Sequence, residues 1–250
     1  MRQSGAITNK DVLIQRLQNQ IRQAETAGRV DDGACISSGC AAIDRILPAG
    51  GYLPGTLVQW LTRGGQGINF LSLLAAKHAC EKGGALVVFD PLNQFYPPAA
   101  AAIGINLDHL IILRSDTSRK CDSSSPDDSQ QKFLWAIDQT LRCPAVAAVW
   151  GAINSINEKW FRRFQLSAES SGCLGLFIQP ICQAHQPSWA EVQWLVGSPS
   201  RQNSNTTPST HAGREQLLSL KLTRCRNTQS GKTIDLSINT ITGDVRQVRS

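Results

Sequence analysis

The chain has 250 residues, of which 41% are hydrophobic and 18% are charged, and its formal net charge is +6. This composition excludes a disordered polypeptide and is typical of one large globular domain with extensions, while the excess of basic residues is compatible with nucleic acid or an acidic protein as a partner. Because no apolar run approaches the roughly 18 residues of a membrane-spanning helix and the N-terminus lacks the apolar stretch of a signal peptide, we expect a cytoplasmic protein that binds no membrane.

The N-terminal segment predicts an amphipathic helix over residues 8–29. Apolar side chains recur on one face at helical spacing, at Leu13, Leu17, Ile21 and Ala24. The apolar stripe is narrow, so the helix can either dock on the protein's own body or serve as a detached arm for another chain. We assign residues 1–30 to an N-terminal helical arm.

The middle of the chain, residues 31–196, alternates short apolar runs with helical patterns. The apolar runs predict strands at GTLVQWL (55–61), GGALVVFD (83–90), HLIILR (109–114), AVAAVW (145–150), CLGLFIQP (173–180) and VQWLV (192–196). The helical patterns cover residues 71–82, 97–105, 124–143 and 157–172. Buried strands separated by helices indicate an α/β core with a mostly parallel sheet flanked by helices and joined by right-handed crossovers.

The C-terminal part has a different pattern. Residues 197–214 are rich in Ser, Asn, Thr and Pro and predict a flexible loop, after which LLSLKLTRC (217–225) and TIDLSIN (233–239) predict a hairpin. We therefore expect residues 215–250 to form a β meander that completes the core sheet. Strict alternation would place four side chains on one face, namely Leu220, Leu222, Arg224 and Arg226.

Cysteine spacing predicts no metal site. The eight cysteines are scattered without a CxxC pair, so we interpret them as buried reduced thiols. Three tryptophans, Trp150, Trp189 and Trp194, are interpreted as core or core-margin packing.

The stretch LTRGGQGINF (61–70) lies where a strand is predicted to run into a helix, as a phosphate-binding loop would. Its positions are Thr62, Arg63, Gly64, Gly65, Gln66, Gly67, Ile68 and Asn69. Aligned on Gly67 with the pattern GxxxxGK[ST], the stretch has no first glycine, no lysine and no hydroxyl residue. A helix N-terminus could still attract an anion through its amides. We expect a structural turn, no nucleotide cofactor and no ATPase activity.

The acidic half of a nucleotide site is also weak in the sequence. Magnesium needs a carboxylate at the end of a later strand, but the run AVAAVW is followed by Gly151 and Ala152. Asp90 does end a strand, without a glutamate beside it, and its expected role is to cap the following turn.

The segment ISSGCAAIDRILPAGGYLPGTLVQWL (36–61) resembles the segment that leads into the phosphate loop of the RecA family. The matching residues are Ile36, Ser38, Gly39, Ile43, Asp44, Gly50, Gly51, Leu53, Pro54 and Gly55. The resemblance implies a RecA-like core. The chain departs from that family at the chemistry, because Ile68 and Asn69 stand where the family has lysine and threonine, and Gly151 where it has aspartate.

Four further stretches resemble the ImuA family of translesion DNA synthesis proteins, which are RecA-like and lack the nucleotide machinery. They are DPLNQFYPPAAAAIGINLDHLIILR (90–114), WAIDQTLRCPAVAAVW (135–150), WFRRFQLSAESSGCLGLFIQP (160–180) and HQPSWAEVQWLV (185–196). This resemblance implies a non-catalytic adaptor in the SOS-induced DNA-damage response. It implies two partners, an ImuB-like Y-family polymerase homologue and an alternative replicative-type DNA polymerase.

Without an active site, function would depend on surfaces. The candidate partner or DNA contacts are Trp160, Arg162, Arg163, Lys221, Arg224 and Arg226. By resemblance to RecA relatives, DNA-contacting loops would fall near 151–160 and 180–190, although helix-face arginines also commonly form intramolecular pairs. Direct DNA binding, with the nucleoid association that it would bring, and assembly into a homo-oligomer stay open.

Two alternative functions remain at this point. An ATP-dependent RecA-type recombinase or motor would bind nucleotide through residues 64–69. An inhibitor of cell division similar to SulA, which blocks FtsZ, would fit the RecA-like core but not the N-terminal helix and C-terminal meander.

Overall fold

The computed structural model describes residues 35–64, 67–114, 126–198, 215–226 and 230–248. Three predictions therefore lie outside the described residues: the N-terminal arm over 1–30, the positions Gly65 and Gln66, and the loop over 197–214 except for its first two residues.

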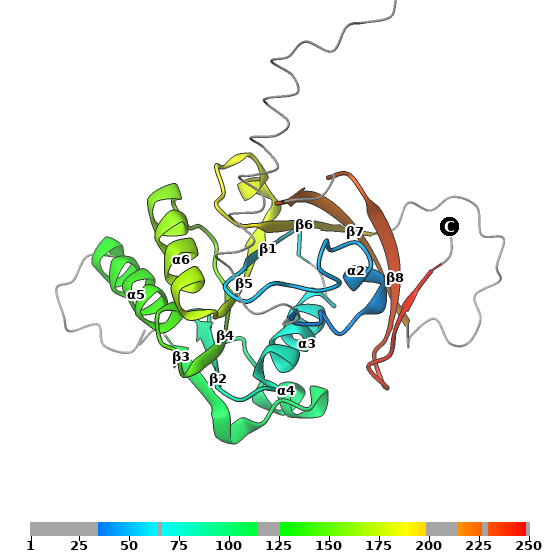
Figure 1. The fold of residues 1–250 in the computed structure, drawn as a ribbon, viewed down its shortest axis with the longest axis horizontal. Helices are drawn as coiled ribbons and strands as arrows, with labels where there is room; N and C mark the ends of the chain where they lie inside the picture. The colour runs from blue at the N-terminus through cyan, green and yellow to red at the C-terminus, as the bar shows by residue number, and fades with distance from the viewer. Residues whose placement is uncertain (1–34, 65–66, 115–125, 199–214, 227–229, 249–250) are drawn as a thin grey trace, which may run out of the picture. The chain divides into compact units, whose positions relative to one another are not determined.

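A nine-stranded sheet organises the described part of the chain (Figure 1), in the order β3-β2-β4-β5-β1-β6-β7-β8-β9. The strands are β1 (Leu57–Thr62), β2 (Ala85–Asp90), β3 (Leu110–Arg114), β4 (Val146–Ala152), β5 (Leu174–Pro180), β6 (Val192–Gly197), β7 (Glu215–Cys225), β8 (Thr233–Asn239) and β9 (Val245–Gln247). Strands β1 to β6 pair in parallel, whereas β6 to β9 pair antiparallel. The predicted α/β fold with a mostly parallel sheet is confirmed.

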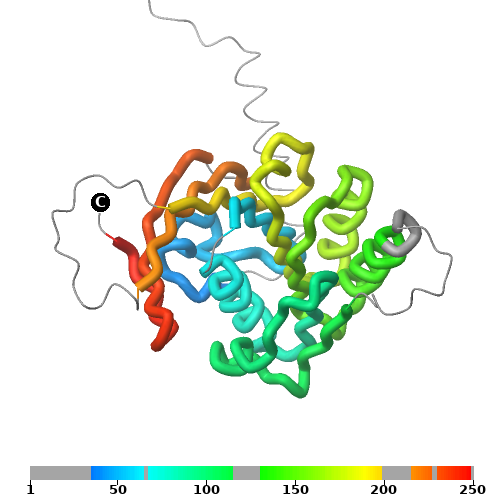
Figure 2. The backbone as a smooth tube through the Cα atoms, turned by 180° about the vertical axis from the view of Figure 1, so that it is seen from behind, coloured from blue at the N-terminus to red at the C-terminus, as the bar shows by residue number. Residues whose placement is uncertain are grey.

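Helices cover both faces of the parallel part of the sheet (Figures 1 and 2). They are α2 (Ala41–Asp44), α3 (Ile68–Cys80), α4 (Pro97–Ile103), α5 (Pro126–Leu141) and α6 (Glu158–Ser171), with short 3-10 turns η1 (Leu107–His109) and η2 (Ile181–His185). Helices α2, α3 and α4 share one apolar core with one face of the sheet, and α5 and α6 share a second core with the other face. Strand β1 lies between the two cores, and all six of its residues are buried.

Local sequence signals explain where α6 begins and ends. The Asn157 side chain accepts a hydrogen bond from the Trp160 N–H, which satisfies a free amide in the first turn. Gly172 follows the last turn with a φ of 79°, a left-handed conformation that favours glycine. These two residues set the length of the helix.

The RecA-like segment before β1 is built around one carboxylate. Asp44 accepts hydrogen bonds from the Ser37 hydroxyl at 2.7 Å and from the Ser38 N–H at 2.9 Å. Tyr52 is fully buried and accepts a hydrogen bond from Trp194 of β6 at 3.2 Å. Ser38 and Asp44, which carry the resemblance, and Tyr52, which does not, therefore all have structural roles in this segment.

The predicted alternation along β7 is wrong beyond Leu222. Trp194 of β6 pairs with Leu222 but the preceding Gln193 pairs with Arg224, so Thr223 is an extra residue, a β-bulge. A bulge shifts the side-chain alternation by one residue. Arg224 therefore lies on the opposite face from Leu220 and Leu222 and not beside them.

None of the helices in the described ranges combines the length and the apolar character needed to cross a membrane.

Candidate functional site

The turn that occupies the phosphate-loop position is covered by a neighbouring strand. Gly67 precedes α3 with a φ of 92°, which favours glycine. A β-carbon at this position would lie 2.8 Å from Cδ1 of Leu218 and 3.1 Å from Oε1 of Gln216, both on β7. Gly67, the last residue of the turn before α3, is therefore packed against β7.

The first turn of α3 places hydrocarbon where a phosphate-binding lysine would stand. Ile68 is 2% exposed and belongs to the core between α3 and the sheet. Asn69 is exposed. Arg63, the cation of the turn, is also exposed and precedes Gly64, whose N–H donates to the Thr62 hydroxyl at 3.2 Å.

The end of β4 presents an indole to α3. Trp150 is 4% exposed, and its Nε1–H donates to the Ser72 hydroxyl on α3 at 2.8 Å. The sequence pattern drew attention to the neighbouring Gly151, because alternation alone does not show which side of β4 faces α3. An indole can neither bind nor orient magnesium, whose preferred ligands are oxygens.

Asp90, the remaining carboxylate near this crevice, is engaged by the protein itself. It is 5% exposed and accepts hydrogen bonds from the Gln94 N–H at 2.8 Å and the Phe95 N–H at 3.0 Å. Arg114 of β3 lies 3.5 Å away. The expected role of Asp90 as a cap of the following turn is confirmed.

A cavity of about 160 Å³ remains beside Trp150, lined by Asn69, Asp90, Phe95, Tyr96 and Ala99 among others. Its walls supply one engaged carboxylate and no lysine. Together with the buried Ile68, this lining does not fit a magnesium–nucleotide complex.

Two of the candidate contact residues, Trp160 and Arg163, belong to a cluster between α5 and α6. Asp138 on α5 is fully buried and lies 2.7 Å from Nη2 of Arg163 and 3.3 Å from Nε of Arg142, and it accepts a hydrogen bond from the Ser167 hydroxyl at 2.6 Å. The Arg163 guanidinium also lies over the Trp160 ring, 5.1 Å from its centroid. The ion pair of Arg163 with Asp138 thus connects α6 to α5.

Burial and these partners act on Asp138 in opposite directions. Desolvation alone would raise the pKa of Asp138, but the hydrogen bonds from Ser167 and Arg163, with the charges of Arg163 and Arg142, outweigh it and lower the pKa below its usual range. Asp138 is therefore ionised at neutral pH.

Arg226 forms ion pairs with two acidic residues, Glu191 just before β6 and Glu169 on α6. Its Nη1 lies 3.3 Å from Oε1 of Glu191 and 3.7 Å from Oε1 of Glu169 on α6. The Thr56 hydroxyl donates to the other oxygen of Glu191 at 3.0 Å. Lys221, in contrast, lies apart from these groups on the exposed side of β7.

The structure brings Arg162 and Arg224 together around Trp189, in the connection between β5 and β6. The Arg162 guanidinium lies 5.0 Å from the Trp189 ring centroid, and Arg224 donates a hydrogen bond to the Ser188 carbonyl. The expected core packing holds for Trp150 and Trp194, whereas Trp189 is 38% exposed. Leu166, one turn after Arg162 on α6, is 57% exposed. It was not named as a candidate contact from the sequence, although its spacing of four residues from Arg162 predicts that both lie on the same face of the helix.

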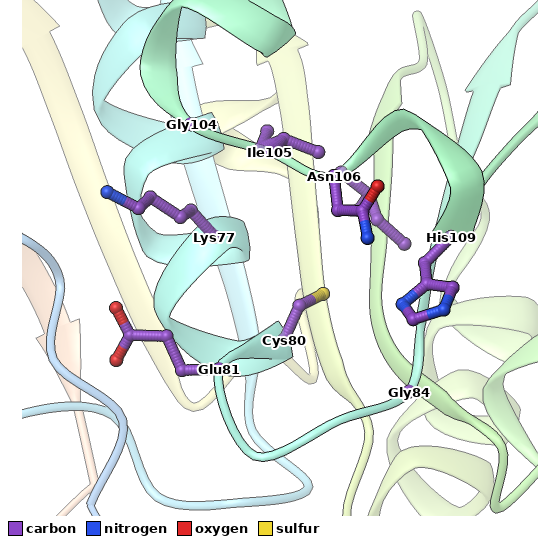
Figure 3. Close-up of a pocket in the computed structure, with 9 residues that line it drawn as sticks. Lys77, Cys80, Glu81, Gly84, Gly104, Ile105, Asn106 and His109 are labelled. Atoms are coloured by element: carbon purple, nitrogen blue, oxygen red, sulfur yellow. The ribbon is translucent and has the colours of Figure 1, made fainter.

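A separate cavity of about 130 Å³ lies where α3 ends and β2 begins. Figure 3 shows the Cys80 thiol pointing toward the segment that carries Asn106 and His109, while Lys77 and Glu81 point away from it. Burial raises the pKa of Cys80 to about 11, so it is a protonated thiol at neutral pH and a poor nucleophile.

Comparison with known proteins supports the RecA-like assignment of the fold. No family model matches the chain. The RecA protein of Latilactobacillus sakei is 32% identical over 85 residues, which are 34% of this chain and 24% of that protein. The RecA protein of Streptococcus agalactiae is 33% identical over 85 residues, which are 34% of this chain and 22% of that protein. The match thus spans about a quarter of the length of these relatives.

Among solved structures, the RadB recombinase is similar with a TM-score of 0.59 and 14% sequence identity. The similarity covers 86% of this chain and 100% of that one. At this identity the likeness is one of fold, and the fold of the chain is RecA-like.

Proposed function

We propose that this protein is a nucleotide-independent RecA-like adaptor in translesion DNA synthesis and DNA repair. In this role it binds a polymerase-like protein of the ImuB type and, through it, an alternative replicative-type polymerase. Its surfaces, and not a catalytic centre, carry the function.

The observation that carries the proposal is the burial of apolar side chains at the start of α3 and at the end of β4. Ile68 is 2% exposed in the core, and the Trp150 indole is 4% exposed and hydrogen-bonded to Ser72. Phosphoryl transfer depends on cations that neutralise phosphate charge, and neither side chain can do so. A RecA-like protein without this chemistry retains a scaffold and its exposed faces.

The stretches that resemble the ImuA family support the same conclusion, because several of their residues have structural roles. Asp90 caps the turn before α4, Ser167 bonds the buried Asp138, and Ser188 bonds Gln59 of β1. These contacts stabilise a fold whose exposed loops and helices are then presented to partners. Fold similarity alone does not determine function, so the assignment needs a direct test.

The test is calorimetric titration of the full chain, first with magnesium-ATP and then with the polymerase-like protein from the same genome. We expect no heat of binding for the nucleotide at concentrations up to about 1 mM and saturable binding of the protein partner. A RecA protein titrated in the same buffer serves as the control for nucleotide binding. Binding of magnesium-ATP would contradict the proposal and favour the ATP-driven recombinase or motor.

A further inference from the structure

Arg162, Trp189 and Arg224 lie together between α6 and the end of β7, and exposed Leu166 follows Arg162 by one turn of α6. We name them the Arg162–Trp189 surface and define it as Arg162 and Leu166 of α6, Trp189 of the β5–β6 connection, and Arg224 of β7. Figures 1 and 2 both show that connection lying beside α6. Leu166 is 57% exposed and Trp189 is 38% exposed, so the surface combines apolar area with two guanidinium groups.

The two arginines of this surface keep their charge available. Across the residues that the structure describes, neither Arg162 nor Arg224 has a carboxylate within ion-pair distance. Arg162 stacks on Trp189, and Arg224 donates to a neutral carbonyl. They differ in this respect from Arg163 and Arg226, which are neutralised by Asp138 and Glu191.

A buried network of amides holds the backbone on either side of Trp189. The Gln59 side chain accepts hydrogen bonds from the Ser188 hydroxyl at 2.7 Å and from Gln193 at 2.8 Å, and donates to Gln179 at 2.5 Å. The Ser188 hydroxyl in turn accepts from the Ala190 N–H at 3.1 Å. Gln59, Gln179 and Gln193 are at most 8% exposed, so these bonds form out of water.

This network makes Trp189 a preformed platform. Ser188 before it is bonded to Gln59 of β1, Ala190 after it is bonded to Ser188, and Arg162 covers the ring from α6. A ligand that binds a preordered segment avoids the entropy cost of ordering it. No nucleotide is needed to set this conformation, because Gln59 and its partners supply the contacts.

We propose that the Arg162–Trp189 surface docks an extended acidic peptide segment of the adaptor's protein partner. A hydrophobic side chain of the peptide packs on Trp189 and Leu166, and its carboxylates pair with Arg162 and Arg224. This inference rests on the proposed adaptor function and names the surface and the chemistry of its partner.

The neighbouring groups favour a peptide over a nucleic acid. Leu166 offers hydrocarbon to the ligand, and the carboxylates of Glu169 and Glu191 lie at one end of the surface around Arg226. A sugar–phosphate backbone carries a charge at every nucleotide and would bring some of them close to these carboxylates. A peptide can place its acidic residues only beside the two available arginines.

The experiment measures binding of the polymerase-like partner, and of fluorescein-labelled peptides that tile its sequence, to the full-length protein and its variants. The variants are Arg162→Glu, Arg224→Glu and Trp189→Ser, with Arg246→Glu as the matched control on β9, where Arg246 is 81% exposed. Thermal melting of each variant checks that it is folded.

We expect an acidic peptide to bind the wild type and the control equally, and each of the three surface variants to weaken it about tenfold or more. Full-length partner binding with no loss in these variants would overturn the inference and leave the adaptor function intact. Absence of partner binding to the wild type would overturn the adaptor function and the inference together. A labelled thirty-nucleotide oligo-dT that binds and is lost in the variants, while partner binding is kept, would assign the surface to nucleic acid instead.

Discussion

At the scale of single residues, a lysine side chain at position 68 would be surrounded by hydrocarbon groups of the core and not by phosphate oxygens or water. Ile68 is 2% exposed and packs in the core shared by α3 and the sheet. An ammonium group buried without a partner is strongly destabilising, because neither water nor an opposite charge solvates it. Position 68 is therefore a packing position in this protein.

We predict that the variant Ile68→Lys with Asn69→Thr, which supplies the two residue types that end a phosphate loop, does not bind magnesium-ATP. Its free energy of unfolding should fall by about 3 kcal/mol because of the buried charge. Urea denaturation measures the stability and calorimetry the nucleotide binding.

Asn69→Thr alone is the control, since Asn69 is exposed, and its stability should stay within about 0.5 kcal/mol of the wild type. A stable double variant that binds magnesium-ATP would show that Trp150 and Leu218 leave room for the nucleotide.

At the scale of elements, Asp138 of α5 joins this helix to α6 through two side chains of α6. It is fully buried, bonds Ser167 and Arg163 of α6, and pairs with Arg142 near its own helix end. Hydrogen bonds to a buried carboxylate contribute more than those between neutral groups. The pair of helices should therefore depend on the charge of this residue.

We predict that Asp138→Asn lowers the free energy of unfolding at pH 7 by about 2 kcal/mol. The folded-state pKa of Asp138 is lowered, so its contribution is present above the unfolded-state pKa of about 3.9 and is lost as the pH falls through the folded value. The stability difference between wild type and variant should therefore stay constant from pH 7 down to about pH 5 and shrink below about pH 4. Denaturant unfolding across that range measures it.

Asp108→Asn, which changes an exposed carboxylate on η1, should alter the stability by no more than about 0.5 kcal/mol at any pH. A difference for Asp138→Asn that is constant with pH would mean that the side-chain shape, and not its charge, holds the helices.

The elements differ in how far their sequences could predict them. The core strands were predictable because each is a short apolar run between helical patterns, and β1 is buried along its whole length. The face of β7 on which Arg224 lies could not be predicted, because the bulge at Thr223 depends on the pairing with β6. At the candidate site, the sequence shows directly that no lysine stands at position 68. The hydrogen bond from Trp150 to Ser72 could not be predicted, because it joins residues 78 positions apart and periodicity describes only local spacing. The partners of Arg163 and Arg226 were hidden for the same reason.

At the scale of the whole molecule, one polar cluster ties the antiparallel strands to the parallel core. Glu191, which precedes β6, is 7% exposed and accepts a hydrogen bond from Thr56, which precedes β1. Arg226, at the end of β7, pairs with Glu191 and with Glu169 of α6, and its N–H donates to the Glu191 carbonyl at 3.0 Å. Strands from both parts of the sheet and a helix therefore meet at this cluster.

We predict that Arg226→Ala lowers the free energy of unfolding by about 2 kcal/mol, because it removes a charged partner from the buried Glu191 carboxylate. The loss should be smaller in a Glu191→Gln background, where no buried charge remains to be neutralised, and a double-mutant cycle from denaturant unfolding measures the difference. Arg246→Ala is the control, since its ion pair with Asp244 at 3.9 Å is exposed, and it should change stability by less than about 0.5 kcal/mol. Amide hydrogen exchange should also accelerate in β7 and β8 for Arg226→Ala and not for the control. If the two variants behave alike, apolar packing of Leu218, Leu220 and Leu222 is sufficient to hold the antiparallel strands on the core.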